Sequence, residues 1–319
     1  MRAIVCALLL AGALATAAQA QSDYPSRPVR IIVPSEPGGG TDTSARAVAD
    51  RLSQSTGQNF VVENRPGAGQ LIGIELVSRA PNDGYTLLVA ASTITILPST
   101  NKNTKYDILR DFAPISLLVA VPSVLVVNPS LPIHSTKGFI AAVKAKPGEY
   151  NFGSAGVGTQ PHMAMELFRE MAGLDMQHIP YKGVAPAMTD IIAGRVSSMV
   201  VNILSAKSQI EGNKLRGLGI SSTKRSAAMP DLPTIAEAAL PGYEAIQWFG
   251  MFAPAGTPPA VVARLHKEIE AALKSAEMQK RMTSDGADAV GNTPGEFTAQ
   301  IKAELEKWAK VAKAAKIGQ

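Results

Sequence analysis

Hydrophobic positions repeat one scheme along most of the chain: a short β-branched run, a glycine-rich turn, then apolar residues at helical spacing. In the N-terminal part, strands are predicted at 29–33, 60–62 and 86–90, with helices that include 45–52 and 72–80. The strands are apolar without interruption, which is typical of a parallel sheet covered on both faces. This part of the chain is therefore predicted to form a βαβαβ unit.

The same scheme starts again near residue 123. It predicts strands at 123–128, 151–153, 177–181, 199–203 and 215–220, and helices at 138–146, 162–171 and 188–193. Two long amphipathic helices, 259–285 and 294–316, follow a connector rich in proline and glycine at 252–258. Two α/β units and a helical tail predict an α/β protein with two lobes and a cleft between them.

The first twenty residues have the pattern of a cleavable secretion signal. Arg2 precedes an uncharged apolar stretch at 3–18, and Ala18, Gln19 and Ala20 form a small-x-small cleavage site. The stretch is shorter than the roughly 20 residues that a membrane-spanning helix needs. We therefore expect cleavage after Ala20 rather than a membrane anchor, and a soluble product in a periplasm.

Composition excludes several function classes. Cys6 is the only cysteine and lies in the signal, so the remaining chain offers no disulfide, cysteine metal site or thiol nucleophile. The formal charge of +5 is mild, no lysine and arginine run occurs, and aromatic residues make up 5%, so nucleic acid is not an expected partner. No two of the four histidines have metal-ligand spacing, so no metal is expected.

Enzyme motifs are incomplete. A phosphate-binding loop with the P-loop signature is absent, and Pro161 stands where a dinucleotide fingerprint starting at Gly156 would need its third glycine. No cofactor is therefore expected. Ser154 lacks the G-x-S-x-G frame of a nucleophile elbow. A hydrolase built on Ser154, His162 and a distant aspartate is the least favoured alternative.

Two glycine turns are the strongest candidates for a binding site. Residues 38–42 (Gly-Gly-Gly-Thr-Asp) and 156–159 (Gly-Val-Gly-Thr) each connect a predicted strand to a helix, one in each unit. Glycines permit close approach of a ligand, and the helix start offers free N–H groups with partial positive charge. Either turn alone could be only a tight connection, but the matched pair predicts an anion site at the carboxyl ends of the strands. Neither turn contains lysine or arginine, which favours a carboxylate. Asp42 either caps its helix or contacts the ligand through water.

Segments distributed along the chain resemble those of a known protein family. The matching segments are 24–34, 37–42, 45–46, 62–69, 83–87, 106–107, 111–114, 151–162, 180–183 and 248–258. In this order they resemble the Bug-type solute-binding proteins, the extracytoplasmic receptors of tripartite tricarboxylate transporters. Each motif is weak alone, but together they cover essentially the whole chain after the signal.

The resemblance implies a type II periplasmic-binding-protein fold, with two lobes joined by two crossovers. Lobe 1 would comprise 21–123 plus 247–319, lobe 2 would comprise 124–246, and the tail helices would return to lobe 1. It implies a monomeric receptor that captures a carboxylate by hinge closure and delivers it to membrane permease subunits. The alternative to a transport receptor is a protein of another functional class, a ligand-sensing co-receptor for a membrane signalling protein.

The resemblance also implies a set of ligand-binding residues. Gly38, Gly39 and Asp42 would hold the proximal carboxylate, with waters bridging to Asp42 and with Ser92 and Thr93 beside it. From lobe 2, Ser154, Thr159 and His162 would meet the ligand, although His162 also fits a purely structural helix-start position.

Two positions bear on ligand identity. In the family that the sequence resembles, many members have an acid near position 202; here it is Asn202, and a neutral side chain would remove a repulsion against a second carboxylate. With Trp248 it would form a flat, partly apolar wall that favours a dianion, such as a di- or tricarboxylate, or an aromatic acid over an ammonium-bearing ligand. Core packing or a hinge contact is an equally weighted role for Trp248.

Overall fold

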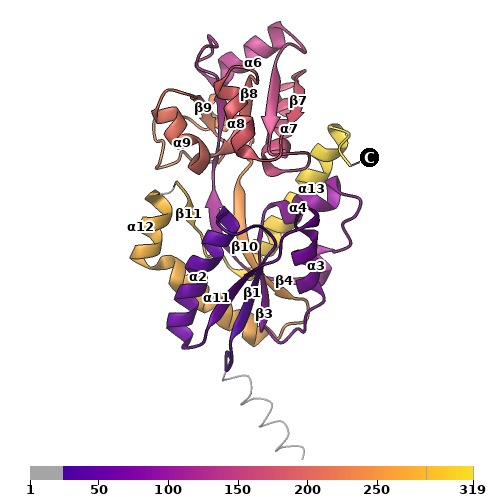
Figure 1. The fold of residues 1–319 in the computed structure, drawn as a ribbon, viewed down its shortest axis with the longest axis vertical. Helices are drawn as coiled ribbons and strands as arrows, with labels where there is room; N and C mark the ends of the chain where they lie inside the picture. Colours follow the sequence, from indigo (N-terminus) through magenta and orange to yellow (C-terminus); the bar gives the residue numbers. More distant parts are fainter. Residues whose placement is uncertain (1–23, 285, 319) are drawn as a thin grey trace, which may run out of the picture.

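The computed structural model of the protein describes residues 24–284 and 286–318, so the predicted signal and its cleavage site lie outside the described residues. Two α/β lobes follow one another along the longest axis of the molecule (Figure 1). Each lobe has its own sheet, with helices on both faces. The predicted two-lobe α/β fold is confirmed. Within the described ranges, no helix combines the length and apolar character that crossing a membrane requires.

The first lobe is built on a six-stranded sheet with the order β11-β4-β10-β3-β1-β2. Its strands are β1 (Val29–Val33), β2 (Phe60–Asn64), β3 (Thr86–Ala91), β4 (Phe112–Val121), β10 (Gln247–Pro254) and β11 (Asp288–Ala289). The three predicted strands are present, and β1 pairs in parallel with β2 and β3. The prediction missed β4 and β10, and the expected connector at 252–258 overlaps the end of β10. Gly250 obscures the strand pattern of β10, and glycine is needed there because a Cβ would overlap the ring of Phe297.

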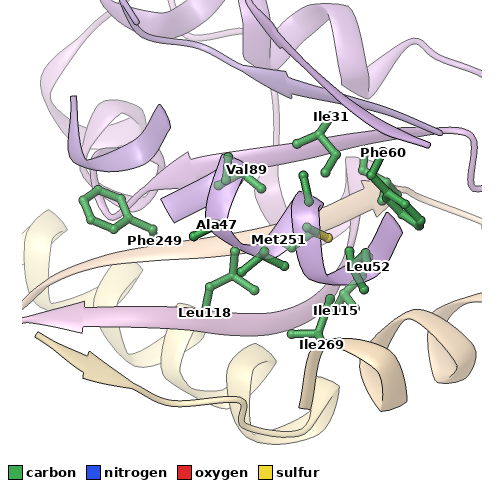
Figure 2. Close-up of a cluster of buried hydrophobic side chains, with 14 of the residues drawn as sticks. Ile31, Ala47, Leu52, Phe60, Val89, Ile115, Leu118, Phe249, Met251 and Ile269 are labelled. Atoms are coloured by element: carbon green, nitrogen blue, oxygen red, sulfur yellow. The ribbon is translucent and has the colours of Figure 1, made fainter. Parts of the chain in front are cut away.

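Helices cover both faces of this sheet. On one face, α2 (Gly40–Thr56) and α11 (Pro259–Lys274) contribute apolar side chains to a shared core (Figure 2). On the other face pack α3 (Leu71–Ser78), α4 (Thr93–Thr100) and the first half of α13 (Pro294–Ala314). The tail helix predicted at 259–285 is in fact α11 and α12 (Ala276–Ser284), because Ser275 has an extended backbone.

The second lobe has a five-stranded sheet with the order β7-β6-β8-β5-β9. The strands are β5 (Ser123–Val127), β6 (Asn151–Ser154), β7 (Gln177–Pro180), β8 (Ser198–Asn202) and β9 (Arg216–Ile220), close to the predicted ranges. One face is covered by α6 (Thr136–Ala145) and α7 (Gln160–Ala172), the other by α8 (Val184–Ile192) and α9 (Ile203–Glu211). Short elements complete the chain: η1 (Ala68–Gln70), α5 (Ile108–Asp111) and α10 (Ile235–Ala238).

Two crossover segments join the sheets, at Pro122 and just before Gln247. Ser221 ties them together: its hydroxyl donates to the carbonyl of Ala245 (2.8 Å) and accepts from the N–H of Ser123 (2.8 Å). The two crossovers therefore lie next to each other at the junction of the lobes.

Helix α13 packs on both lobes and so forms a third connection between them. Phe297 and Ile301, near its start, belong to the core of the first lobe, whereas Trp308 and Val311 belong to that of the second. Between them lies Glu304, which accepts hydrogen bonds from Trp248 and Thr95. Helix α13 therefore returns to the first lobe with its first half, as expected of the tail helices, and packs on the second lobe with its second half.

Candidate functional site

The first glycine loop lies between β1 and α2, and Asp42 braces it. The backbone of Gly38 is left-handed (φ +84°), and its N–H donates to Oδ2 of Asp42 at 2.9 Å. Arg46, one turn further along α2, contacts both carboxylate oxygens, with Nε 3.1 Å from Oδ2 and Nη2 3.0 Å from Oδ1. Asn64, at the end of β2, donates to Oδ1 at 3.0 Å. These bonds fix the loop to the neighbouring strand.

The same contacts determine the protonation state of Asp42. Burial of this carboxyl raises its pKa, but the hydrogen bonds from Arg46, Gly38 and Asn64 outweigh that effect, so the pKa lies below its usual value. Asp42 is therefore ionised and paired, which explains how an acid lies beside a predicted anion site. Gly39 and not Asp42 is the N-cap of α2, so Asp42 braces the loop from the first turn of the helix instead of capping it.

The second glycine loop, between β6 and α7, has a similar brace. Gly156 and Gly158 are left-handed (φ +127° and +74°), and the N–H of Gly158 donates to Nδ1 of His162 at 3.0 Å. Because Nδ1 accepts, the ring proton of neutral His162 is on Nε2, which lies 3.5 Å from Oε1 of Glu166. The imidazole is buried, so His162 supports the loop from behind.

Ser154 lies beneath this loop and bonds with His178, not with His162. Its Oγ is 2.7 Å from Nε2 of His178, and it accepts from the N–H of Gly156 at 3.1 Å. The rings of His178 and His162 are stacked with centroids 3.8 Å apart. Burial, and then the neighbouring His162, lower the pKa of His178 to about 4. The hydrolase arrangement of Ser154 with His162 is contradicted, because these side chains have other partners and Ser154 is fully buried.

A cavity of about 220 Å³ lies between the lobes next to the first glycine loop. The first lobe contributes Gly40 and Thr41 from the start of α2, Val121 from the end of β4, and Gln247 and Phe249 from β10. The second lobe contributes Asn202, Leu204 and Ser205 from the first turn of α9 and its cap. None of these side chains is ionisable. Two helix N-termini, each with a partial positive charge, therefore meet at one uncharged cavity.

Of the predicted site residues, Asn202 lines this cavity directly, and Gly38 and Gly39 immediately precede Gly40, which also lines it. The Oδ1 of Asn202 accepts from the N–H of Ser205 at 2.9 Å, so Asn202 caps α9. This is consistent with its predicted position near the ligand.

Trp248 does not line this cavity. Successive side chains of a strand point to opposite faces, so Gln247 and Phe249 face the cavity whereas Trp248 enters the core. Its indole nitrogen donates to Oε1 of Glu304 at 2.9 Å. The structure supports the core-packing role of Trp248, and the aromatic residue at the cavity is Phe249, one position further on. Strand alternation is the signal that could have identified it, once β10 was known.

Phe249 packs directly against the start of α2 and lies at the edge of the first-lobe core (Figure 2). A Cβ on Gly40 would lie 2.8 Å from Cζ of Phe249, so only glycine fits between this ring and the helix. Packing against Phe249 therefore favours glycine at position 40.

The remaining predicted residues lie in α4 and the second glycine loop, outside the lining of this cavity. Ser92 precedes α4, and its N–H donates to the carbonyl of Trp248 at 2.8 Å; Thr93 follows it. Thr159 belongs to the second loop, where a Cβ on Gly158 would lie 2.9 Å from Oγ1 of Thr100 in α4. The two lobes are therefore also close to each other where the second glycine loop approaches α4. No cluster of three metal-ligating side chains occurs in the part of the chain that the structure describes.

Two α/β lobes, adjacent crossovers and an uncharged cavity at facing helix N-termini define a solute-binding receptor of the periplasmic type. The family model described as "Tripartite tricarboxylate transporter family receptor" matches residues 44–317. Protein BugT of Bordetella pertussis is 38% identical over 315 residues, which cover 97% of this chain and 95% of BugT.

Solved structures agree with this class. R. palustris Rpa4515 with adipate is 36% identical with a TM-score of 0.80, and the periplasmic binding protein BugD is 36% identical with a TM-score of 0.76. Each match covers 92% of this chain and 99% of the other. The chain belongs to the tripartite tricarboxylate transporter receptor family. It is a receptor rather than an enzyme.

Proposed function

We propose that this chain captures a carboxylate in the cavity between α2 and α9 and delivers it to the membrane permease of a tripartite tricarboxylate transporter. It would do so in the periplasm, after cleavage at Ala20, as a monomer. The observation that carries the proposal is the meeting of two helix N-termini, at Gly40 and at Ile203, beside one uncharged cavity.

The chemistry of this cavity suits a carboxylate. The oxygens of a carboxylate accept hydrogen bonds only, and the first turn of α2 offers backbone N–H groups that have no partner within the helix. In α9 the N–H groups of Ile203 and Ser205 already donate to Pro122 and Asn202, which leaves the N–H of Leu204. Hydroxyl and amide groups of Thr41, Ser205 and Gln247 supply further donors. Asn202 is neutral, so it adds no repulsion. The adipate in the related R. palustris protein supports the same ligand chemistry.

The other predicted residues have supporting roles in this proposal. Asp42 and His162 hold the two glycine loops in shape through Gly38 and Gly158. Ser92, Thr93, Ser154 and Thr159 would complete the ligand surroundings on the α4 side.

Binding would favour closure of the lobes, because the cavity takes residues from both. A ligand shifts a conformational equilibrium by its difference in affinity for the two states. A carboxylate bridging α2 and α9 has most contacts when the lobes are together. The permease would then recognise the closed receptor.

Thermal unfolding and calorimetric titration of the full mature chain test the proposal. The ligands are succinate, malate, adipate, citrate, phthalate, nicotinate and glutamate, with adipamide as the uncharged match for adipate. At least one carboxylate should raise the unfolding temperature and bind, while adipamide should not. If no carboxylate binds, or if adipamide binds as tightly as adipate, the proposal is wrong.

A further inference from the structure

A second cavity of about 180 Å³ adjoins the first and differs from it in chemistry. The two share Gly40, Val121, Leu204 and Phe249 as lining residues, so they form one groove. The first part contains the polar side chains of Thr41, Asn202, Ser205 and Gln247.

In the second part, Val119, Met282 and Ala287 take the place of those polar groups. The hydroxyl of Thr43, which also lines it, already donates to the carbonyls of Gly39 and Gly40 at 3.2 Å. The described residues of this part thus present mainly apolar surface.

Leu204 presents apolar surface to this groove. It lies in the first turn of α9, lines both parts, and is 45% exposed. Phe249 and Val121, which line the same groove, are nearly fully buried and form its floor. A ligand that covers Leu204 removes apolar surface from water, which favours binding.

From this groove we infer that the ligand is an amphipathic carboxylate, with its charged group near Gly40 and Thr41 and an aliphatic or aromatic body between Leu204, Phe249 and Met282. The inference rests on the proposed function and specifies its substrate class. A small diacid could fill the polar part, but a second carboxylate placed beside Val119 and Met282 would lose its hydration and gain at most the hydroxyl of Ser44, which also lines this part. Leu204 is then a specificity-determining residue.

The experiment compares affinities by calorimetry for hexanoate and 3-phenylpropanoate, which have apolar bodies, and for succinate, which has none. Leu204→Asn removes the apolar surface at a half-exposed position, so the fold should persist, which circular dichroism checks. Ile72→Asn is the matched control, because Ile72 is 54% exposed and lies in α3, outside the groove.

The wild-type chain should bind at least one apolar-bodied acid more tightly than succinate. Leu204→Asn should weaken that binding roughly tenfold and weaken succinate binding by a smaller factor, while Ile72→Asn should change neither. The inference is overturned if succinate is the better ligand, or if Leu204→Asn leaves the binding of both apolar-bodied acids unchanged or weakens succinate equally. Binding of succinate alone would leave the proposed function intact, whereas failure of every carboxylate would remove both.

Discussion

The backbone N–H of Gly158 donates to Nδ1 of His162 at 3.0 Å, and its counterpart in the other lobe is the bond from Gly38 to Asp42 at 2.9 Å. In both loops the acceptor is the third residue of the following helix, four positions after the glycine. A carboxylate and an imidazole thus perform the same task in the two lobes. Both residues would affect a ligand through the shape of a loop.

Asp42→Asn tests this bracing role. The change leaves Arg46 without its ion-pair partner, so stability should fall by about 1–2 kcal/mol, and carboxylate affinity should fall with it. Urea unfolding and calorimetry measure the two effects. Arg46→Gln should reproduce both losses. If Asp42→Asn reduces affinity without changing stability, Asp42 acts on the ligand and not on the loop.

The close Gly40–Phe249 contact predicts a compensating pair of substitutions. Gly40→Ala should destabilise the protein by roughly 1–3 kcal/mol, because the new methyl group overlaps the Phe249 ring. Phe249→Leu in the same chain should recover part of that loss, since the shorter side chain vacates the space. A double-mutant cycle measures the coupling. Additive losses would show that the ring is not the obstacle.

His178 predicts how stability depends on pH. Its pKa is lowered to about 4 by burial and by His162, whereas the unfolded chain titrates near the ordinary value of about 6.5. The unfolded state therefore binds more protons between these values, and stability should decline as the pH falls from about 6.5 to 4.

For a partly buried ring this effect should be on the order of 1 kcal/mol. Urea unfolding at pH 7 and at about pH 5 measures it. His178→Gln should make the decline shallower. An unchanged decline in this variant would assign the pH dependence to other groups.

The indole of Trp248 is predicted to stabilise the fold rather than to select ligands. Burial raises the pKa of Glu304, despite the nearby Lys307 and the hydrogen bonds from Trp248, Thr95 and Trp308. Trp248→Phe removes a donor from this buried carboxyl and should cost about 1–3 kcal/mol of stability. Trp308→Phe is the control, since its nitrogen is 3.4 Å from Glu304 and should cost less. If Trp248→Phe impairs aromatic ligands selectively, Trp248 belongs to the site.

Much of the fold was predictable, because each lobe repeats short apolar strands and glycine turns. Strands 29–33 and 151–153 were recognisable from such local signals. The central strand β10 was not, since Gly250 interrupts its pattern for a packing reason that lies in α13. The sequence also did not reveal which lobe the end of α13 contacts, because an amphipathic pattern does not specify the core against which a helix packs.

The site was predictable in its backbone and less so in its side chains. Glycine turns revealed the loops at Gly38 and Gly158, but assigning Trp248 or Phe249 to the cavity requires strand orientation. The pairing of Ser154 with His178 depends on the parallel register of β6 and β7, which no local pattern contains. Arg46 lies one helical turn from Asp42, so that ion pair could have been inferred from spacing.

Carboxylate affinity in the Asn202→Asp variant, measured by calorimetry with the best ligand of the panel, tests the proposed site most directly. Aspartate still caps α9 but adds a negative charge to the cavity. The exposed Asn103→Asp is the charge-matched control outside it. If a carboxylate lies between α2 and α9, Asn202→Asp should weaken binding roughly tenfold or more, and Asn103→Asp should have less than about a twofold effect. Equal affinities in the two variants would contradict the proposed site.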